Sequence, residues 1–197
     1  MSEQNQKYAS SDTRRREIAA AARAVIVEKG IDGLRTREVA ARVGINIATL
    51  HYHVHSKEDL LRLVIEAMRE EFVEQGRYID AQALDPLAKL KLEIGEYKEL
   101  IVHKPDLLPL FEELGKRART DPVLEPIVRE IRIGWHRRFV GLLDEGKANG
   151  QFRATLDAEA GAHMIVGALV AFQYKPRHLL PIFDSVADEI IRSVIAT

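Results

Sequence analysis

Gly44 divides residues 36–57 into two helical patterns, and this division constrains the fold more than any other feature of the chain. Before the glycine, three apolar residues repeat at helical spacing: Val39, Ala40 and Val43. A glycine after such a stripe favours a helix end, because it adopts a left-handed conformation without a Cβ penalty. After it, Asn46 is a typical N-cap, and Leu50 and Val54 lie four apart. The segment is therefore predicted to be a helix-turn-helix.

The side chains turned away from these apolar stripes are mostly hydrogen-bonding, cationic or aromatic. They are Arg37, Asn46, Thr49, His51, Tyr52, His53 and Lys57. Base edges and phosphates in a DNA groove are the natural partners of such side chains. The pattern therefore indicates a motif that binds DNA.

The sequence around the motif makes this interpretation more specific. An amphipathic helix is expected over residues 12–30, the sequence GIDGLRTREVA follows it, and LHYHVHSKEDLL ends the motif. This order closely resembles the DNA-binding domain of the tetracycline-repressor (TetR) family of bacterial one-component regulators, over roughly residues 12–61. His51 stands where the family most often has Tyr, and Val54 stands where Phe is commoner.

Composition is that of an ordinary globular protein. Of the 197 residues, 46% are hydrophobic and 30% are charged, which is enough for a real core in one large or two modest domains. The absence of cysteine excludes a disulfide framework and a thiolate metal site. Neither a membrane span nor a hydrophobic leader is visible in the sequence. We therefore expect a cytoplasmic protein with no membrane partner.

Charge is unevenly distributed, although the net charge is only −1. Residues 1–57 contain ten Lys or Arg against six Asp or Glu, whereas the rest contains nineteen against twenty-four. Three consecutive arginines, residues 14–16, open the first expected helix. Such a run is usually a solvated face, but beside a helix-turn-helix it favours contact with phosphates.

The chain is expected to be all-α, with about nine helices, because no alternating strand pattern is present. Capping residues and prolines place the later helices at about residues 86–103, 106–119, 121–148, 157–174 and 180–195. We expect four parts: a flexible polar arm (1–11), the DNA-binding domain (12–56), a connecting helix (57–75), and an effector-binding and dimerisation domain (76–197).

The TetR resemblance implies roles for individual residues of the motif. Thr36 and Lys57 match positions that contact the DNA backbone, and Thr36 can also cap its helix. Arg37 matches a position that contacts bases, and an arginine can pair bidentately with guanine. Asn46 can pair with adenine or serve only as the N-cap. The full predicted DNA-binding set is Thr36, Arg37, Asn46, Ile47, Ala48, Thr49, His51, Tyr52, His53 and Lys57. Within it, the expected specificity set is Arg37, Ile47, Ala48 and His51.

Two further sets of residues are predicted in the later part of the chain. Aromatic and polar residues among apolar ones can line an effector pocket: Tyr97, His103, Phe111, Trp135, Phe139, Phe172 and Gln173. Small and apolar residues of the last two helices can pack against a second copy: Gly161, Met164, Ala168, Phe183, Val186, Ile190 and Val194. Each residue can instead belong to plain core or surface. The resemblance implies a dimer through a four-helix bundle.

These observations predict a dimeric transcriptional regulator, most simply a repressor, that binds a palindromic operator in double-stranded DNA and is released by a small-molecule effector. An activator, a corepressor-dependent regulator, or an interaction module with a vestigial DNA-binding head are the alternatives. No nucleophile elbow, P-loop or HExxH motif is present, so neither an enzyme nor a cofactor is expected. No metal site is expected at His51, His53 and His55, because no carboxylate or thiolate matches them.

Overall fold

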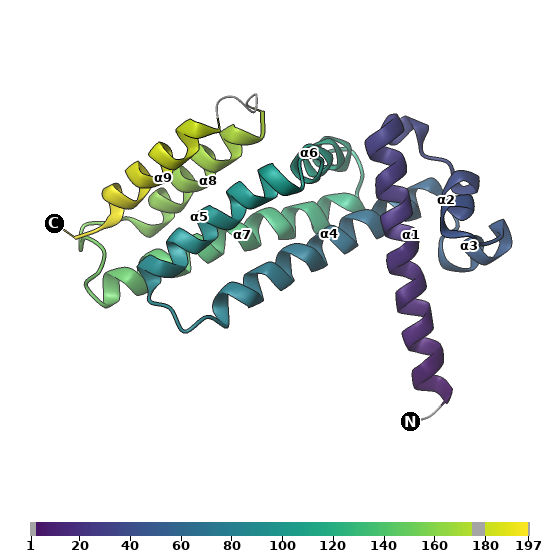
Figure 1. Ribbon diagram of the computed structural model, residues 1–197, viewed down its shortest axis with the longest axis horizontal. Helices are drawn as coiled ribbons and strands as arrows, with labels where there is room; N and C mark the ends of the chain where they lie inside the picture. The colour runs from purple at the N-terminus through teal and green to yellow at the C-terminus, as the bar shows by residue number, and fades with distance from the viewer. Residues whose placement is uncertain (1–2, 175–179, 197) are drawn as a thin grey trace. The chain divides into compact units, whose positions relative to one another are not determined.

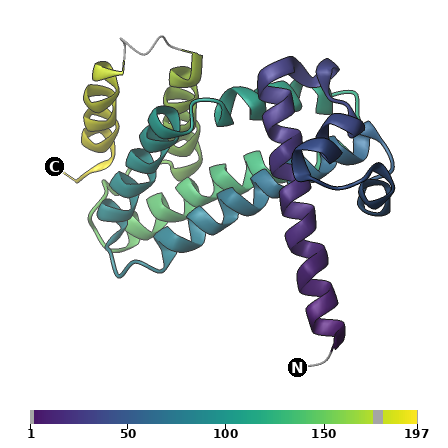
Figure 2. The same cartoon turned by 45° about the vertical axis from the view of Figure 1, so that its right-hand side comes forward.

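Helices make up the regular structure in the computed structural model, which describes the backbone of residues 3–174 and 180–196 and the side chains of residues 11–173 and 180–196 (Figures 1 and 2). In chain order they are α1 (Glu3–Gly33), α2 (Thr36–Val43), α3 (Ile47–His53), α4 (Lys57–Asp80), α5 (Pro86–His103), α6 (Leu107–Ala118), α7 (Leu124–Ala148), α8 (Ala158–Val170), the 3₁₀ helix η1 (Ala171–Tyr174) and α9 (Pro181–Val194). Within the described ranges, the only β pairing is an isolated bridge between Phe152 and Ile195. The predicted all-α fold is confirmed.

The first helix begins at Glu3 rather than near Asp12, so residues 3–11, expected as part of a flexible arm, are helical. The first two residues of that arm lie outside the described range. Residues 3–11 contain no glycine or proline and include Glu, Gln, Lys and Ala, which favour helix. The helix kinks at Gly30 (φ 73°, ψ 169°), where the sequence placed its end.

Capping side chains start several of the later helices at or near the predicted positions. The Asp85 side chain accepts a hydrogen bond from the Ala88 amide at 2.8 Å, and that of Asp157 accepts one from the Ala160 amide at 3.0 Å. Asp121 accepts hydrogen bonds from the amides of residues 123 and 124, so it holds a turn, and α7 begins only at Leu124. None of the helices in the described ranges is long and apolar enough to cross a membrane.

The chain forms two compact units. Unit 1 contains residues 1–71 and 110–128, and unit 2 contains residues 72–109 and 129–197. This division differs from the expected one, because residues 110–128 group with the DNA-binding helices and not with the rest of the chain after residue 75. Their buried residues form an apolar stripe: Leu110, Leu114, Ala118, Leu124 and Val128. Such a stripe predicts a buried face but does not reveal which unit buries it.

Helix α4 belongs to both units, with residues up to Glu71 in unit 1 and residues from Phe72 in unit 2. It ends at Asp80 and not near Gln75 as predicted, because Gly76 does not break it. A Cβ atom at Gly76 would lie only 2.9 Å from a guanidinium nitrogen of Arg138. The glycine therefore serves a close approach inside the helix rather than its end.

Arg138 of α7 connects three helices within unit 2. Its Nε donates to Glu93 of α5 at 2.7 Å, and one terminal nitrogen donates to Asp80 of α4 at 2.8 Å. Glu93 is only 7% exposed, and burial raises the pKa of its carboxyl group although Arg138 opposes that rise. A buried carboxylate of this kind is tolerated because a guanidinium compensates its charge.

We expect the substitution Arg138→Met to lower the free energy of unfolding by about 3 kcal/mol, because it leaves the buried Glu93 carboxylate without its partner. This loss of stability should become smaller as the pH falls from the raised pKa of Glu93 in the folded protein towards the ordinary pKa of a glutamate. The reason is that a protonated Glu93 carboxyl group needs no counter-charge. Urea denaturation at several pH values measures both effects.

The neighbouring exposed Arg137 supplies the matched control, and Arg137→Met should change stability by less than about 0.5 kcal/mol. The double variant with Glu93→Met and Arg138→Met should recover most of the lost stability. A double variant as unstable as the single one would show that the ion pair is not the cause.

Candidate nucleic-acid interface

The turn between α2 and α3 is closed by two backbone hydrogen bonds around Gly44. The Gly44 amide donates to the Ala41 carbonyl at 3.2 Å, and the Ile45 amide donates to the Ala40 carbonyl at 3.0 Å. Gly44 has φ 75° and ψ 29°, which is the left-handed conformation that this pair of bonds requires. The predicted glycine turn is therefore confirmed.

Helix α3 starts from the side chain of Asn46, whose Oδ1 accepts a hydrogen bond from the Thr49 amide at 2.7 Å. Asn46 thus serves as the N-cap, one of its two predicted roles. Thr36 does not cap α2 as expected. It is the first helical residue, and the position before it, Arg35, makes no side-chain capping bond among the described residues. The first amides of α2 are consequently not occupied by a capping side chain.

A reciprocal capping box starts α4 directly after the motif. The Asp59 amide donates to the Ser56 hydroxyl at 3.0 Å, and the Ser56 amide donates back to the Asp59 carboxylate at 3.2 Å. The His55 amide also donates to this carboxylate at 3.0 Å, and these bonds, His55 first, lower the pKa of Asp59. The capping box fixes the point at which the chain leaves α3 and so places Lys57.

The apolar side of the motif is buried and the predicted DNA-binding side is accessible. Val39, Leu50 and Val54 are at most 2% exposed, so they hold α2 and α3 in the core of unit 1. All ten predicted DNA-binding residues keep accessible surface. Three are partly buried: Thr36, His53 and Lys57. Seven are exposed: Arg37, Asn46, Ile47, Ala48, Thr49, His51 and Tyr52.

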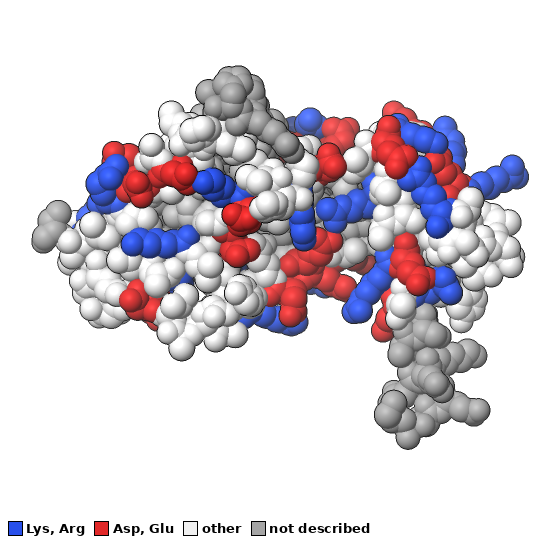
Figure 3. Space-filling view, viewed as in Figure 1, with Lys and Arg blue, Asp and Glu red and all other residues white. Residues whose placement is uncertain are grey.

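Helix α3 carries no Lys, Arg, Asp or Glu in its sequence IATLHYH. In the view of Figure 3 its surface is accordingly uncharged, while acidic and basic side chains surround it on the neighbouring helices of unit 1. Its exposed groups are a hydroxyl, imidazoles, a phenol and short apolar side chains. Such groups contact base edges and methyl groups, whereas positive charge for phosphates must come from outside α3.

Two arginines of α2 differ in what they contact. Arg42 forms ion pairs with Glu28 at 2.5 Å and with Glu38 at 2.9 Å. Arg37 is exposed and makes no hydrogen bond or ion pair with any residue that the structure describes. Arg37 is therefore available for an external partner, whereas Arg42 is paired with carboxylates of unit 1.

Positive charge also lies near the end of α3. Burial lowers the pKa of His53, and the charges of Arg15 and Arg14 lower it further. The lowered pKa favours the neutral form of His53. Among the residues that the structure describes, Lys57 makes one long ion pair of 3.8 Å, with the fully exposed Asp32, a contact that a phosphate can readily replace.

Residues 18–64, which contain this geometry, match the family described as "Bacterial regulatory proteins, tetR family". This match confirms the predicted resemblance to the tetR family over the DNA-binding helices. The HTH-type transcriptional repressor KstR2 of Mycolicibacterium smegmatis is 27% identical over 150 residues, which cover 75% of this chain and 71% of the relative.

Solved structures of tetR-family and other transcriptional regulators share the fold over almost the whole chain. A putative regulator from Saccharomonospora viridis in complex with choline has a TM-score of 0.78 at 18% identity and covers 94% of this chain and 100% of its own. FadR from Bacillus subtilis in complex with stearoyl-CoA has a TM-score of 0.70 at 22% identity, with 90% and 97% covered. At these identities the likeness extends to the fold alone.

Of the seven residues predicted to line an effector pocket, four belong to one hydrophobic cluster in unit 2: Tyr97, Trp135, Phe139 and Phe172. Tyr97 stacks on Trp135 with ring centroids 5.2 Å apart, and Trp135 contacts Phe139 edge-on at 5.6 Å. Within this cluster Phe172 pairs edge-on with Phe183. Two others lie elsewhere, because His103 is an exposed partner of Glu99 and Phe111 belongs to unit 1. Gln173 is half-buried. Helical periodicity could not exclude Phe111 from this set, because periodicity does not assign residues to units.

A shallow, open depression of about 450 Å³ lies in unit 2, between the end of α7 and the start of α8. Its described lining contains none of the seven predicted effector residues. It is formed by Val140, Asp144, Lys147 and residues 154–159.

The predicted dimer residues divide between core and surface. Gly161, Phe183 and Val194 are buried in unit 2 itself, so in this structure they offer little surface to a second copy. Met164 is 71% exposed. The remaining three are half-buried: Ala168, Val186 and Ile190. The apolar stripe of α9 predicted a buried face correctly, but burial against the same chain and burial against a copy give the same pattern.

Arg37→Ala should weaken binding to the operator by about 1–3 kcal/mol and relax the preference at one base pair, because it removes a base contact. Arg42→Ala is the matched control. It breaks ion pairs within the head and should leave base preference unchanged. Fluorescence anisotropy on duplexes with single base changes measures both. Equal weakening on every duplex would identify Arg37 as a phosphate contact instead.

Asn46→Ala should lower the free energy of unfolding by about 0.5–2 kcal/mol through loss of the cap. Asn46→Asp keeps a good capping group and should retain stability, but its negative charge should weaken DNA binding. Urea denaturation and anisotropy, run on both variants, separate the two effects. Unchanged DNA affinity in Asn46→Asp would remove Asn46 from the interface.

Proposed function

We propose that this protein is a dimeric transcriptional repressor of the tetR family that reads a palindromic operator with α3 and residues flanking it, and that a small-molecule effector bound in unit 2 releases it. The observation that carries the proposal is the division of α2 and α3 into a buried apolar side and an accessible side that contains all ten predicted DNA-binding residues. A helix-turn-helix held in this way can present α3 to a major groove.

The separation of charge around α3 supports a particular division of roles. Arg37, Thr49 and His51 would contact base edges, with Ile47 and Ala48 against thymine methyl groups. Lys57 and the first amides of α2 would contact phosphates, and so position the head without reading sequence. Tyr52 and His53, whose rings meet edge-on at 5.2 Å, would pack against the sugar–phosphate backbone at the other end of α3.

A second copy is needed because one head reads too few base pairs for tight, specific binding. Helices α8 and α9 contact each other, and α9 also contacts α5 (Figures 1 and 2). The accessible face of α8 contains the small residues Ala160 and Gly167 beside the exposed Met164, and the exposed Ala171 follows at the start of η1. A second α8 can approach such a face closely, and the half-buried Ala168, Val186 and Ile190 would lie near its edge.

Effector binding would act on the heads through α4. This helix begins with Lys57 in unit 1, and its last residue, Asp80, is bonded to Arg138 in unit 2. A ligand that displaces α7 near the stacked Tyr97 and Trp135 would disturb the Arg138 contacts and move α4. To shift a dimer from almost fully bound to almost fully released, the effector must favour the released state about 10⁴-fold, or roughly 5.5 kcal/mol.

Selection from a random DNA library with the intact protein tests the proposed function. We expect an enriched palindrome whose half-sites lie about 10 base pairs, or one helical turn, or a multiple of that, apart. Binding to it should weaken steeply with salt because phosphate contacts release counterions. No enriched motif in the absence and presence of candidate effectors, or a motif without symmetry, would contradict the proposal.

Trp135 provides an intrinsic reporter for the effector, because it is the only tryptophan in the chain. A compound that binds beside the Tyr97–Trp135 stack should change tryptophan fluorescence at the same concentrations that release the selected duplex. A panel of acyl-CoA and quaternary ammonium compounds is a reasonable start, because the similar regulators described above were solved in complex with stearoyl-CoA and with choline. Release without any fluorescence change would place the effector away from this stack.

A further inference from the structure

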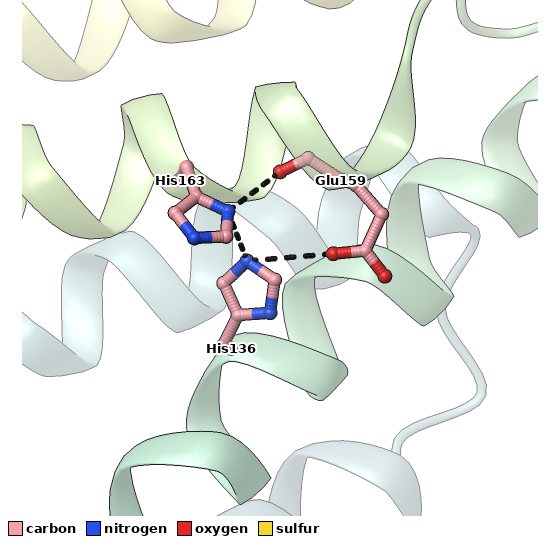
Figure 4. A group of neighbouring side chains, drawn as sticks. All are labelled: His136, Glu159 and His163. Atoms are coloured by element: carbon pink, nitrogen blue, oxygen red, sulfur yellow. Dashed lines mark hydrogen bonds and ion pairs between the residues drawn. The ribbon is translucent and has the colours of Figure 1, made fainter.

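Three metal-ligating side chains converge in unit 2, away from the histidines that the sequence analysis weighed as metal ligands. Glu159 and His163 lie four residues apart on α8 and so share one face of the helix. His136 of α7 points at them from the facing helix (Figure 4). One ligand atom from each residue lies within 4.8 Å of the other two.

The distances between these atoms approach those around a tetrahedral ion. His136 Nε2 lies 2.7 Å from His163 Nδ1 and 3.8 Å from a Glu159 carboxylate oxygen. Two ligands of one zinc ion lie roughly 3.4 Å apart, because each bond is about 2.0–2.2 Å long. One separation is slightly short and the other slightly long, and the exposed side chains of Glu159 and His163 can move to equalise them.

Hydrogen bonding explains how the cluster is arranged without an ion. His163 Nδ1 lies 3.0 Å from the Glu159 carbonyl oxygen, an acceptor, so this nitrogen carries the hydrogen. His136 Nε2 then accepts from the same N–H group, and its lone pair points towards His163. An ion bound to both rings would replace this hydrogen, which His163 Nδ1 directs to His136 Nε2 and to the Glu159 carbonyl oxygen.

We propose that His136, Glu159 and His163 form a binding site for a first-row divalent transition metal such as Zn²⁺, which links α7 to α8. Two imidazoles and one carboxylate suit Zn²⁺ and its neighbours in the series, whereas Mg²⁺ and Ca²⁺ require more oxygen ligands. Glu159 also lines the open depression of about 450 Å³, so water or a small anion can reach the remaining coordination position.

This site is separate from the DNA-binding residues and does not depend on the proposed function. It revises the expectation of no metal site, which considered only histidines near one another in sequence. The pair Glu159 and His163 is visible in the sequence, but a Glu–His pair four apart is common on helix surfaces. Only the packing of α7 on α8 adds His136.

Zinc titration of the intact, tag-free protein against a chromophoric chelator tests the site. We expect one Zn²⁺ per chain and no competition from Mg²⁺ or Ca²⁺. Replacement of zinc by Co²⁺ should give visible absorption bands typical of nitrogen and oxygen ligands in a four- or five-coordinate site. His136→Ala, Glu159→Gln and His163→Ala should each weaken zinc binding. The effect should exceed the roughly 10–100-fold loss that follows when a group that only hydrogen-bonds to a metal ligand is removed.

His103→Ala is the matched control. His103 and Glu99 form an exposed i,i+4 pair at 2.9 Å, similar to the α8 pair but without a third ligand assigned to it, and zinc binding should be unchanged. Circular dichroism confirms folding of each variant. Absence of zinc binding, equal binding by His163→Ala, or one ion for every two chains would each overturn the proposal.

Discussion

The left-handed backbone at Gly44 is the constraint on which the DNA-binding head depends. The backbone hydrogen bonds of Gly44 and Ile45 end α2 and set the direction in which the chain continues. This direction places Asn46 where it caps α3. A residue with a Cβ atom at φ 75° would strain this turn. A different turn would rotate α3, and then Leu50 would leave the core while the accessible groups would no longer face outward together. One glycine therefore determines both how the motif is buried and what it can contact.

In the DNA-binding head, the residues expected to contact bases are separate from the residues expected to contact phosphates. Helix α3 has no charged residue, so its contacts can depend on hydrogen-bond pattern and shape, which differ between base pairs. Cations lie on the flanking helices, where many are already paired with carboxylates, as Arg42 is with Glu28. Such pairing limits non-specific attraction to any phosphate backbone, and the accessible Arg37 is left for a defined contact. Specificity therefore depends on both kinds of cation: those neutralised by carboxylates, such as Arg42, and those still accessible to DNA, such as Arg37.

Most of the helix positions could be predicted from interactions between residues close in sequence. The way in which the helices group in space could not. Gly44, Asn46, Asp85 and Asp157 act through neighbours within a few residues, and the structure has each in the predicted conformation or role. The end of α4 predicted near Gln75 was wrong, because Gly76 lies inside the helix and its close approach to Arg138 is invisible in a linear pattern. The assignment of residues 110–128 to unit 1, which includes Phe111, and the convergence of His136 on α8 have the same origin. Each depends on which helix faces which, and periodicity reveals only that a face is buried.

The central claim is that two heads of this protein bind one symmetric operator. Native mass spectrometry of the intact protein with the selected duplex measures this most directly. The account predicts a complex of two chains per duplex, which disappears when the sequence of one half-site is scrambled. A complex of one chain per duplex, or a two-chain complex that is unaffected by scrambling, would contradict it.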